Sequence, residues 1–416
     1  MELSADILAD GWYVCYTESK GDDRMEWLRN ICKQREEELI ALRRALHRVP
    51  EIGLRLPRTK AIVCAKLDQL GIPYRENEGD DGVIAEIRGV KPGKTIAFRA
   101  DMDALHIQEV DRPYASEIPG QMHGCGHDAH TAMLLMAAAI LNEHKDRLCG
   151  TVRLLFQTAE EKGIGAHQMI AEGALDGVDA ICAIHVGTLA GEEYNSGDLI
   201  VLPGPVTAGK NRVTVTVHGK GTHSAFPEMG IDPIGVAARI LLAAEELSDK
   251  KKGVVLSFGN VEAGIDHNTI PDRAVLRGGL RVQDEQLREE LGRQVTQIAE
   301  QLAADVGATC EVEIKKGSVT VMNDPQLSAL VAQAVERVCP GRVITQSGMP
   351  LMGSDDFCHY AVRVPGVYFF LHTNNRQKGI EAFNHNPGFD VDESVLWEGV
   401  AAYVATALDT LENISE

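Results

Sequence analysis

The amino-acid sequence predicts an α/β layer fold that is interrupted by a smaller α+β domain. Three apolar runs of strand length, separated by helical stretches, support this prediction: Thr95–Arg99, Val152–Phe156 and Ala180–Ile184. Continuous apolar runs of this length are typical of strands that are buried on both faces. From about Gly209 the pattern changes to period-two alternation, which indicates a second domain. A chain of 416 residues is long enough for two hydrophobic cores.

The first domain is predicted over residues 25–208 and 318–416. Residues 1–24 show no clear amphipathic period, and they stay an unassigned N-terminal extension. Helices are expected at the following positions: Met25–His47, Thr59–Leu70, Ala129–Asn142 and Ala166–Glu172. The alternation of these helices with the three buried runs predicts a sheet with helices packed on it.

The inserted domain is predicted over residues 209–317. The segment Arg212–His218 (RVTVTVH) alternates as a strand with one solvated face does. The elements after it are expected to be a helix, two strands, a helix and a strand: Pro233–Ser248, Val254–Val261, Ala274–Val282, Glu285–Val306 and Cys310–Lys315. This β-α-β-β-α-β order is typical of the ferredoxin-like split βαβ sandwich. The first domain resumes near Ser318.

The composition argues against several classes of function. Lys and Arg total 41 and Asp and Glu total 61, so the net charge is −20, which disfavours binding to nucleic acid or to anionic membranes. No run of 18 apolar residues predicts a membrane span, and the acidic first 30 residues do not resemble a signal peptide. Nine irregularly spaced cysteines indicate no disulfide framework. We therefore expect a reducing, cytoplasmic location.

Polar side chains follow each of the three buried runs. Asp101 and Asp103 come after the first run, Glu160 and Glu161 come after the second, and His185 ends the third. Open α/β sheets bind ligands at the edge where the carboxyl ends of the strands lie. We therefore expect three distant segments to converge on one site.

The segment MHGCGHDAHT places Cys125 and His127 two residues apart, with Asp128 and His130 close behind. Its two glycines let the backbone turn both side chains toward one point, so we expect a loop and not a helix face. A thiolate beside an imidazole favours zinc, although nickel, cobalt and manganese stay open. A structural zinc site would be closed by four protein ligands, with no spare base, and the nearby acidic pair argues against such a site.

The segment FQTAEEKG ends the second buried run with two adjacent carboxylates. Adjacent side chains diverge in extended backbone, so one can bind a metal while the other faces the water. We assign Glu161 as the ligand and Glu160 as the general base. Taken alone, His185 and His385 would more often be ordinary strand-end and loop histidines. A two-metal site, however, needs ligands beyond the first pair.

The chain resembles the auxin-conjugate, hippurate and N-acyl-amino-acid amidohydrolases, a branch of the aminoacylase and carboxypeptidase G superfamily. The resemblance runs from about Leu42 to Val400. The motifs that carry it are HRVPEIGLRLPRT, FRADMDAL, GCGHDAHTAMLL, FQTAEE, AIHVG, GKGTHSAFPEMGIDPI, HNTIPDRAVLRGGLR, GSDDF and NHNPGFDVDE.

This resemblance implies a mixed-sheet, metallopeptidase-type catalytic domain with two divalent metal ions in each subunit. Zinc or manganese is expected, with cobalt and nickel as alternatives. The implied metal ligands are Cys125, His127, Glu161, His185 and His385. Glu160 would be the catalytic base, and Asp103 would orient the groups beside the metals.

The same resemblance makes the inserted domain a lid and dimerisation domain, and it implies a homodimer or a higher homo-oligomer. His223 resembles a histidine that reaches the neighbouring subunit's site and stabilises the tetrahedral oxyanion. Asn268 and Arg281 resemble a pair that recognises the substrate carboxylate, which a guanidinium binds through two parallel hydrogen bonds. From the residues alone, Arg281 would be taken as a solvated strand residue.

Four residues depart from the family pattern. Thr158 stands where proline is common, and Asp355 stands where glutamate is usual. Asn384 and Asn386 give the predicted ligand between them an unusual polar setting. All five implied ligands are present, so the departures bear on substrate choice more than on catalysis.

The sequence therefore predicts an enzyme, a metal-dependent amidohydrolase. It would hydrolyse the amide bond of N-acyl or aryl-acyl amino acids, which are small molecules, and release a carboxylic acid and an amino acid. One alternative is a dipeptidase or carboxypeptidase that uses the same site. The other is a catalytically silent metal-binding or sensor protein, and the retention of Glu160 and His223 argues against it.

Overall fold

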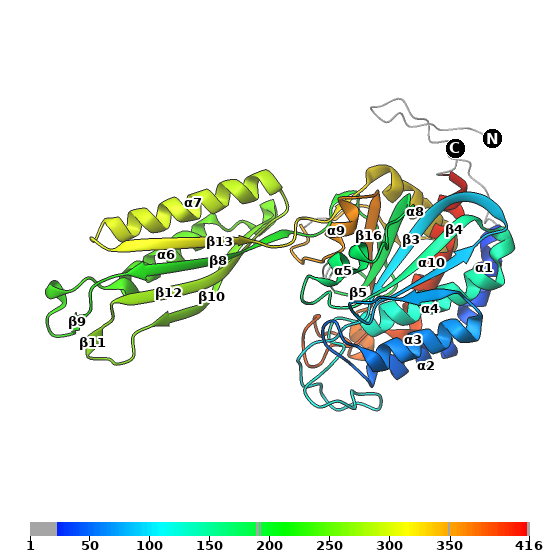
Figure 1. Cartoon of the computed structure of the whole chain (residues 1–416), viewed down its shortest axis with the longest axis horizontal. Helices are drawn as coiled ribbons and strands as arrows, with labels where there is room; N and C mark the ends of the chain where they lie inside the picture. Colours follow the sequence, from blue (N-terminus) through cyan, green and yellow to red (C-terminus); the bar gives the residue numbers. More distant parts are fainter. Residues whose placement is uncertain (1–22, 189–190, 192, 348–349, 414–416) are drawn as a thin grey trace, which may run out of the picture.

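The structure is a computed structural model that describes residues 23–188, 191, 193–347 and 350–413. A large α/β lobe carries an elongated lobe that extends away from it (Figure 1). Neighbouring segments lead into the elongated lobe at β8 (Gly209–His218) and out of it at β13 (Thr309–Lys316), and these two strands pair with each other.

An eight-stranded mixed sheet forms the centre of the large lobe, in the order β1-β2-β4-β3-β5-β16-β6-β15. The strands are β1 (Tyr74–Glu76), β2 (Val83–Arg88), β3 (Lys91–Asp101), β4 (Cys149–Gln157), β5 (Ala180–Gly187), β6 (Leu199–Ile200), β15 (Val343–Ile344) and β16 (Gly366–His372). Strands β4, β3, β5 and β16 are parallel. Strand β2 runs antiparallel to β1 and β4, and β6 runs antiparallel to β16 but parallel to β15. The predicted α/β class is confirmed, and each of the three predicted buried runs lies within one of the parallel strands.

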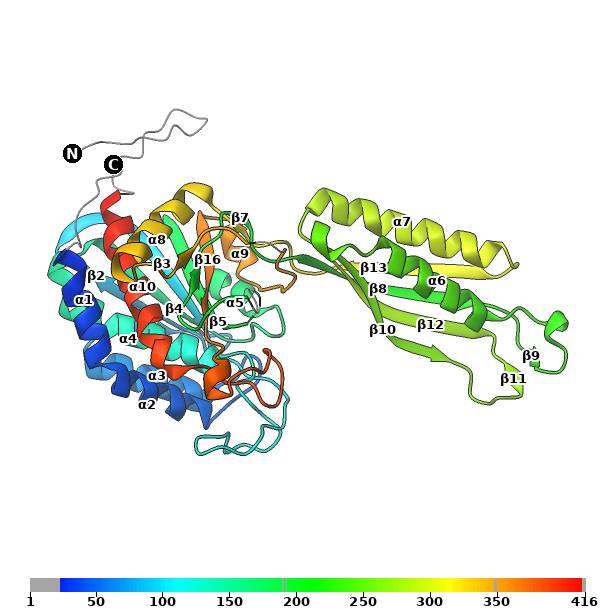
Figure 2. The ribbon, with the colours of Figure 1, turned by 180° about the vertical axis from the view of Figure 1, so that it is seen from behind.

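Helices cover both faces of this sheet (Figure 2). One face shares a hydrophobic core with α1 (Asp23–Gln34), α2 (Glu36–His47), α3 (Pro57–Leu70), α4 (His127–Glu143), α8 (Pro325–Val338) and α10 (Leu396–Asn413). The opposite face packs against the shorter helices α5 (Gly165–Ala171) and α9 (Cys358–Ala361). Helix α4 is buried along nearly its whole length because it lies between the sheet and α2, α3 and α10.

The helix predicted over Met25–His47 is wrong in one respect, because it divides at Arg35. The φ of Arg35 is −102° and its ψ is 10°, and its backbone amide bonds to the carbonyl of Cys32, three residues back. The division lets α1 pack against α8 and α10 while α2 packs against α4. An ion pair between Arg35 and Glu143 of α4 holds the junction.

The elongated lobe is a four-stranded antiparallel sheet in the order β10-β12-β8-β13. Its further elements are α6 (Pro233–Leu247), β10 (Val254–Ala263), β12 (Arg273–Val282) and α7 (Glu285–Ala304). Burial alternates along β8, so Val213, Val215 and Val217 face the helices and join a core that is separate from those of the large lobe. The far end of the lobe is a small ribbon of β9 (Thr222–His223) and β11 (Thr269–Ile270) (Figure 1).

Short elements complete the described chain. They are the paired strands β7 (Gly204–Pro205) and β14 (Met322–Asn323) and the 3-10 turns Lys145–Arg147, Pro227–Met229, Lys250–Lys252, Arg376–Lys378 and Glu393–Val395. Among the described residues, no helix combines the length and apolar character that crossing a membrane requires. The eight cysteines within the described ranges are free thiols, and Cys15 lies outside those ranges.

Candidate metal centre and active site

Five side chains with metal-ligand atoms meet at the edge of the large sheet where the carboxyl ends of its parallel strands lie. Cys125, His127 and His185 form one group whose ligand atoms all lie within 4.8 Å of one another. Cys125, Glu161 and His385 form a second group within the same limit. The thiol belongs to both groups, so the arrangement has the form of two adjacent cation positions.

Hydrogen bonds orient the histidines of the first group. Nδ1 of His127 donates to the backbone carbonyl of Asp103 at 2.8 Å, and Nδ1 of His185 donates to the carbonyl of Val186 at 2.7 Å. Each ring therefore offers the lone pair of Nε2 to the site. The Nε2 of His185 lies 3.5 Å from the sulfur of Cys125.

The donor atoms of these side chains fit bound cations. Nε2 of His127 and Oε1 of Glu161 are buried and have no hydrogen-bond partner. Oε1 of Glu161 lies 4.0 Å from that nitrogen and 3.3 Å from Nε2 of His385. Leaving such lone pairs buried and unpaired is costly, and a shared metal ion would satisfy them. Thiolate, imidazole and carboxylate are all ligands that zinc accepts.

His130 lies close to the same site but offers it no free ligand atom. Its Nδ1 is 2.5 Å from Oδ1 of Asp101, and its Nε2 accepts the backbone N–H of Val186 at 2.8 Å. Both ring nitrogens are therefore engaged. His130 ties the end of β5 to the end of β3.

The expectation that Cys125 and His127 both lie in a loop is wrong for His127, which is the first residue of α4. Gly126 precedes the helix with a φ of +88°, a conformation that residues with a Cβ rarely adopt. A Cβ at this position would lie 2.4 Å from Cγ2 of Val186. Glycine is therefore needed here for two reasons: it adopts the positive φ of the turn, and it leaves room for β5 to pack closely against it.

The acidic pair lies in a turn and not in the extended backbone that we expected. Asp103 supports this turn, because its two carboxylate oxygens accept the backbone N–H groups of Glu160 and Glu161 at 3.0 and 3.2 Å. The preceding residue, Ala159, has a φ of 53°. It and His385, with a φ of 68°, are the two non-glycine residues with positive φ in the described chain. Backbone strain of this kind concentrates at functional sites.

The loop that carries His385 is tied to the same centre. The backbone N–H of His385 donates to the carbonyl of Gly124 at 2.7 Å. The side-chain amide of Asn384 donates to the carbonyls of Cys125 and Val186, each at 3.3 Å. Asn384, one of the departures from the family pattern, thus fastens the histidine loop to the thiol segment.

Burial governs the electrostatics of the site. It raises the pKa of the Cys125 thiol to about 12, and the charge of Glu161 adds to this effect, so a thiolate here needs a cation beside it. Burial, followed by the carboxylates of Asp355 and Asp356, raises the pKa of Glu160 well above its ordinary range. Burial also raises the pKa of Asp356 to about 7, although Arg99 opposes the shift.

A cavity of about 200 Å³ opens onto these groups. Cys125, Glu160, Glu161, His185 and His385 line it from the large lobe. Lys210 and Arg281 line it from the elongated lobe. This cavity therefore joins four of the five predicted ligands, the predicted base and one predicted substrate-binding residue. The fifth predicted ligand, His127, does not line the cavity but belongs to the ligand group of Cys125 and His185.

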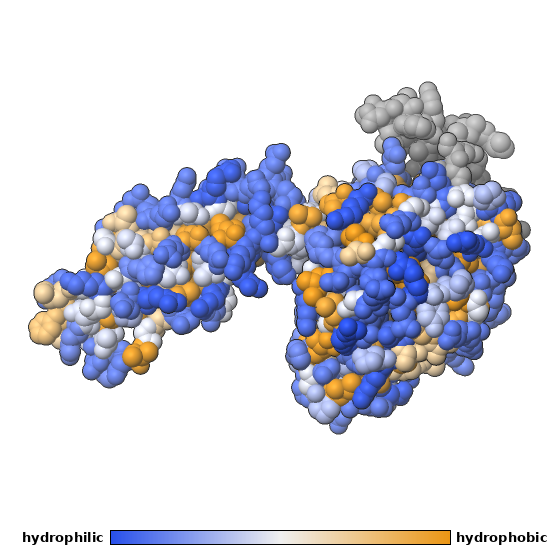
Figure 3. Space-filling view, viewed as in Figure 1, coloured by the Kyte–Doolittle hydropathy of each residue, from blue (hydrophilic) through white to orange (hydrophobic). Residues whose placement is uncertain are grey.

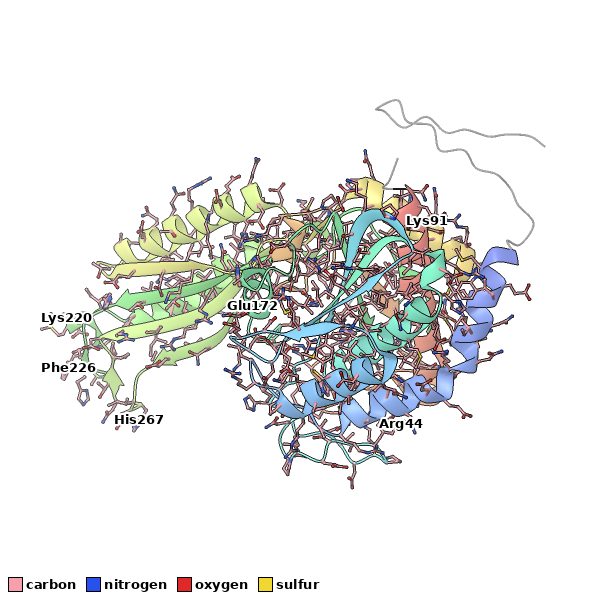
Figure 4. The ribbon with its side chains drawn as sticks, turned by 45° about the vertical axis from the view of Figure 1, so that its right-hand side comes forward. Arg44, Lys91, Glu172, Lys220, Phe226 and His267 are labelled. Atoms are coloured by element: carbon pink, nitrogen blue, oxygen red, sulfur yellow. The ribbon has the colours of Figure 1, made fainter. Side chains whose placement is uncertain are left out.

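The structure does not bring His223 and Asn268 to this cavity. Both lie at the remote end of the elongated lobe, where Thr269 pairs with His223 and the N–H of Ser224 donates to the carbonyl of Asn268 at 2.9 Å. Figure 4 places Lys220, Phe226 and His267 at this end. Arg281 lies near the other end of β12. At the rise of an extended strand, it is therefore roughly 25 Å from the end of the lobe that contains His223 and Asn268.

Comparison with known proteins decides the family. Residues 97–409 match the profile of peptidase family M20/M25/M40. The chain belongs to this family. The resemblance expected from the sequence motifs is therefore confirmed, and the M20 chain is a member of a family of hydrolases.

Two curated relatives align with nearly the whole M20 chain. Thermostable carboxypeptidase 2 from Saccharolobus solfataricus is 36% identical over 395 residues, which cover 93% of this chain and 98% of the relative. IAA-amino acid hydrolase ILR1-like 5 from Arabidopsis thaliana is 33% identical over 398 residues, which cover 94% of this chain and 88% of the relative.

A solved structure supports the fold. The crystal structure of the Bacillus subtilis YXEP protein, described as a dinuclear metal binding peptidase from the M20 family, superposes with a TM-score of 0.80. It is 32% identical, and the match covers 91% of this chain and 99% of that chain. The M20 chain therefore has the same architecture as a dinuclear metal binding peptidase.

Sequence reasoning missed a buried charge cluster behind the base. Arg99 of β3 contacts Asp101 at 2.6 Å and Asp356 at 2.9 Å, and Tyr368 donates its hydroxyl to Asp355 at 2.8 Å. The shorter side chain at Asp355 is therefore fully engaged. A signal was available, because an arginine inside a buried run needs carboxylate partners, and the GSDDF motif supplies them.

A further departure, Thr158, lies in a close backbone contact that the sequence did not reveal. Its backbone carbonyl approaches Gly165 so closely that a Cβ there would lie 1.6 Å from the oxygen. Its own hydroxyl is buried without a hydrogen-bond partner. The turn after β4 therefore depends on the absence of a side chain at Gly165.

Proposed function

We propose that this protein is a metal-dependent amidohydrolase that cleaves the amide bond of N-acyl amino acids. The observation that carries the proposal is a single cavity that joins metal-ligand atoms, an uncoordinated acid and a cation. Cys125, which both ligand groups share, lines the cavity with other members of the two groups, and Glu160 and Arg281 line it as well. An amide with a free α-carboxylate needs all three kinds of group.

Cys125, His127, Glu161, His185 and His385 would hold two divalent metal ions. Bound there, such ions lower the pKa of water and polarise the substrate carbonyl. The mixed donor set favours zinc or manganese, and cobalt or nickel are the alternatives. A thiol ligand requires a reducing compartment, which supports a cytoplasmic location.

The protein's own residues would carry the proton and hold the substrate. A carboxylate oxygen of Glu160 accepts the proton of the attacking water and returns it to the departing amine nitrogen. Asp103 fixes the turn that aims this carboxylate, through the two backbone N–H groups that it accepts. Arg281 binds the α-carboxylate of the substrate through parallel hydrogen bonds.

Residues 209–317 would act as a lid and dimerisation domain. His223 and Asn268 are too far from the cavity of their own chain to act there, so a second copy would supply them. Phe226, Met229 and Ile265 are exposed at the same end of the lobe, where the surface has apolar patches (Figure 3). Exposed apolar side chains of this kind favour an interface with a second copy.

The test is a substrate and metal screen. Metal-stripped protein is supplied with zinc, manganese, cobalt or nickel and assayed with N-acetyl and N-benzoyl amino acids and with dipeptides. Release of free amino acid from the acylated substrates, dependent on added metal, is the expected result. Faster cleavage of dipeptides would favour a carboxypeptidase or dipeptidase, the activity named for the Saccharolobus relative. No turnover of any substrate would favour the silent metal-binding protein.

A further inference from the structure

Two cationic side chains line the candidate active-site cavity from the elongated lobe. Lys210 of β8 and Arg281 of β12 are directly opposite each other in the antiparallel pairing of these strands. Opposed residues point to the same face of a sheet, with their Cβ atoms about 5 Å apart. The same cavity contains Cys125, Glu161 and His385. Two positive charges therefore face the groups that would hold the metals.

Neither cation has a carboxylate partner among the described residues. Nη1 of Arg281 donates to the carbonyl of Met352 at 3.1 Å and to the hydroxyl of Ser354 at 3.3 Å, and both of these acceptors are neutral. In the described part of the chain, no carboxylate oxygen lies within 4.0 Å of the ammonium of Lys210. The two charges are thus left open toward the cavity.

Arginines elsewhere in the interior are neutralised. Arg43 lies 2.7 Å from Asp128, and Arg99 lies 2.6 Å from Asp101. A chain with 61 acidic and 41 basic residues has carboxylates available for such pairs. Their absence beside Lys210 and Arg281 indicates room for a ligand that brings its own negative charge.

The position of Lys210 is held by its backbone and by a glycine. Its N–H donates to the carbonyl of Ser318, and its carbonyl accepts the N–H of Gly317, both at 2.9 Å. A Cβ at Gly317 would lie 3.2 Å from Cγ of Lys210 and 2.7 Å from its carbonyl oxygen. The lysine stem therefore lies against a bare stretch of backbone at the junction of the two lobes.

We propose that the cavity selects N-acyl amino acids whose amino-acid part carries a second carboxylate, namely N-acyl aspartate and N-acyl glutamate. This inference rests on the proposed amidohydrolase function. A planar guanidinium satisfies one carboxylate by itself, so Arg281 binds the α-carboxylate. The compact ammonium of Lys210 binds the side-chain carboxylate, which these amino acids carry one or two methylene groups from the α-carbon. The acyl group then extends toward Cys125 and His385.

The test compares a charged substrate with its neutral isostere. We measure kcat/KM of the metal-loaded enzyme for N-acetyl-L-glutamate and for N-acetyl-L-glutamine. The wild type should prefer the glutamate substrate by about 10- to 100-fold, the range of a charge-assisted hydrogen bond. Lys210→Met should bring this preference close to unity, mainly by raising KM for the glutamate substrate.

Lys315→Met is the matched control. Lys315 lies on β13, opposite Arg212 of β8, and it is exposed and paired with Glu313. Its substitution removes the same charge from the same sheet and should leave the preference unchanged. A wild-type enzyme without the preference, or a Lys210→Met enzyme that keeps it, would overturn the proposal.

Two further arms separate the possible failures. The same comparison is made for N-succinylglycine and N-butanoylglycine, which differ in a charge on the acyl group. A preference for N-succinylglycine that exceeds the preference for glutamate over glutamine would put the second charge on the acyl side and would also overturn the proposal. Calorimetric binding of both glutamine and glutamate ligands to the metal-loaded Glu160→Gln variant does not depend on turnover. If this variant binds the glutamate ligand more tightly and the wild type turns over neither substrate, the proposed hydrolytic function is wrong, whereas the recognition of the second carboxylate by Lys210 is supported.

Discussion

The carboxylate of Asp103 accepts the backbone N–H of Glu160, with 3.0 Å between Oδ1 and the nitrogen. Its other oxygen accepts the N–H of Glu161 at 3.2 Å, and its backbone carbonyl accepts Nδ1 of His127 at 2.8 Å. One residue therefore orients the candidate base and two candidate ligands. It does so without pointing a free oxygen at the cavity.

We predict that Asp103→Asn lowers both kcat/KM and metal affinity by about 10- to 100-fold, as loss of a group that orients metal ligands does. The amide has one acceptor oxygen, and its NH₂ group would face a backbone N–H. Steady-state kinetics and metal titration check this. Asp179→Asn is the matched control, because Asp179 also accepts a backbone amide, that of Thr95 at 2.8 Å, in the half of β3 that is remote from the site. Equal losses in the two variants would contradict the orienting role.

Substitution of Glu160 should remove catalytic activity, whereas substitution of its neighbour Glu161 should remove bound metal. Glu160→Gln should keep bound metal while kcat falls by about 100- to 10,000-fold, the usual contribution of a general base. Glu161→Gln should instead lose metal, because its Oε1 is the buried oxygen that approaches His127 and His385. Metal per subunit after dialysis and kcat are measured on both variants. Full activity in Glu160→Gln would show that Glu160 is not the general base.

The thiol shared by the two ligand groups should control metal occupancy. Cys125→Ala should lower bound metal in both positions, since the sulfur belongs to both groups. Cys182→Ala is the matched control, because it removes a fully buried sulfur from the middle of β5. It should reduce stability by about 1 kcal/mol or more and leave metal content unchanged. Unchanged metal content in Cys125→Ala would show that the ligand assignment is wrong.

Much of this site was accessible from the sequence because its chemistry follows strand order. Parallel strands β3, β4 and β5 end at one edge, so polar residues just after buried runs had to converge there. Cys125 and His385 required more than periodicity, since each lies in an irregular segment whose path depends on tertiary contacts. Asn384 supplies such contacts through bonds to two distant carbonyls.

Other features depended on packing that no local pattern encodes. The division at Arg35 follows from two helix surfaces that each need a different partner. The turn at Ala159 has positive φ, which a non-glycine residue adopts against its local preference. Lys210 looks like any solvated strand residue, and only its pairing with Arg281 across β8 and β12 brings it to the cavity.

Two adjacent arginines on α2 should make very different contributions to the free energy of unfolding. The side chain of Arg43 is fully buried and contacts Asp128 at 2.7 Å and Glu393 at 3.2 Å. Arg43→Met leaves these carboxylates without their cation and should reduce the free energy of unfolding by about 3–5 kcal/mol. Arg44 also pairs with Glu393, but 40% of its side chain is exposed, so Arg44→Met should cost under about 1 kcal/mol. Urea unfolding of both variants checks this, and similar losses would contradict it.

A buried carboxyl at the start of α10 should make stability depend on pH. Glu398 is 5% exposed, and its Oε2 has no hydrogen-bond partner. Burial raises its pKa to about 7 from 4.5, although Arg342, at 3.8 Å, opposes the shift. Between these two pH values the folded state holds a proton that the unfolded state has released. The carboxyl therefore favours folding below about pH 4.5, and this advantage is lost as the pH rises through 7.

Glu398→Gln keeps a neutral side chain of the same shape at every pH. At pH 8 the variant should be more stable than the wild type, by up to about 3 kcal/mol from the size of the shift. At pH 5 the difference should shrink to about 1 kcal/mol or less, because the wild-type carboxyl is neutral in the folded state and the unfolded state has only begun to release its proton. Urea unfolding at both pH values measures the difference. A stabilisation of the same size at pH 5 and pH 8 would mean that ionisation of Glu398 is not its cause.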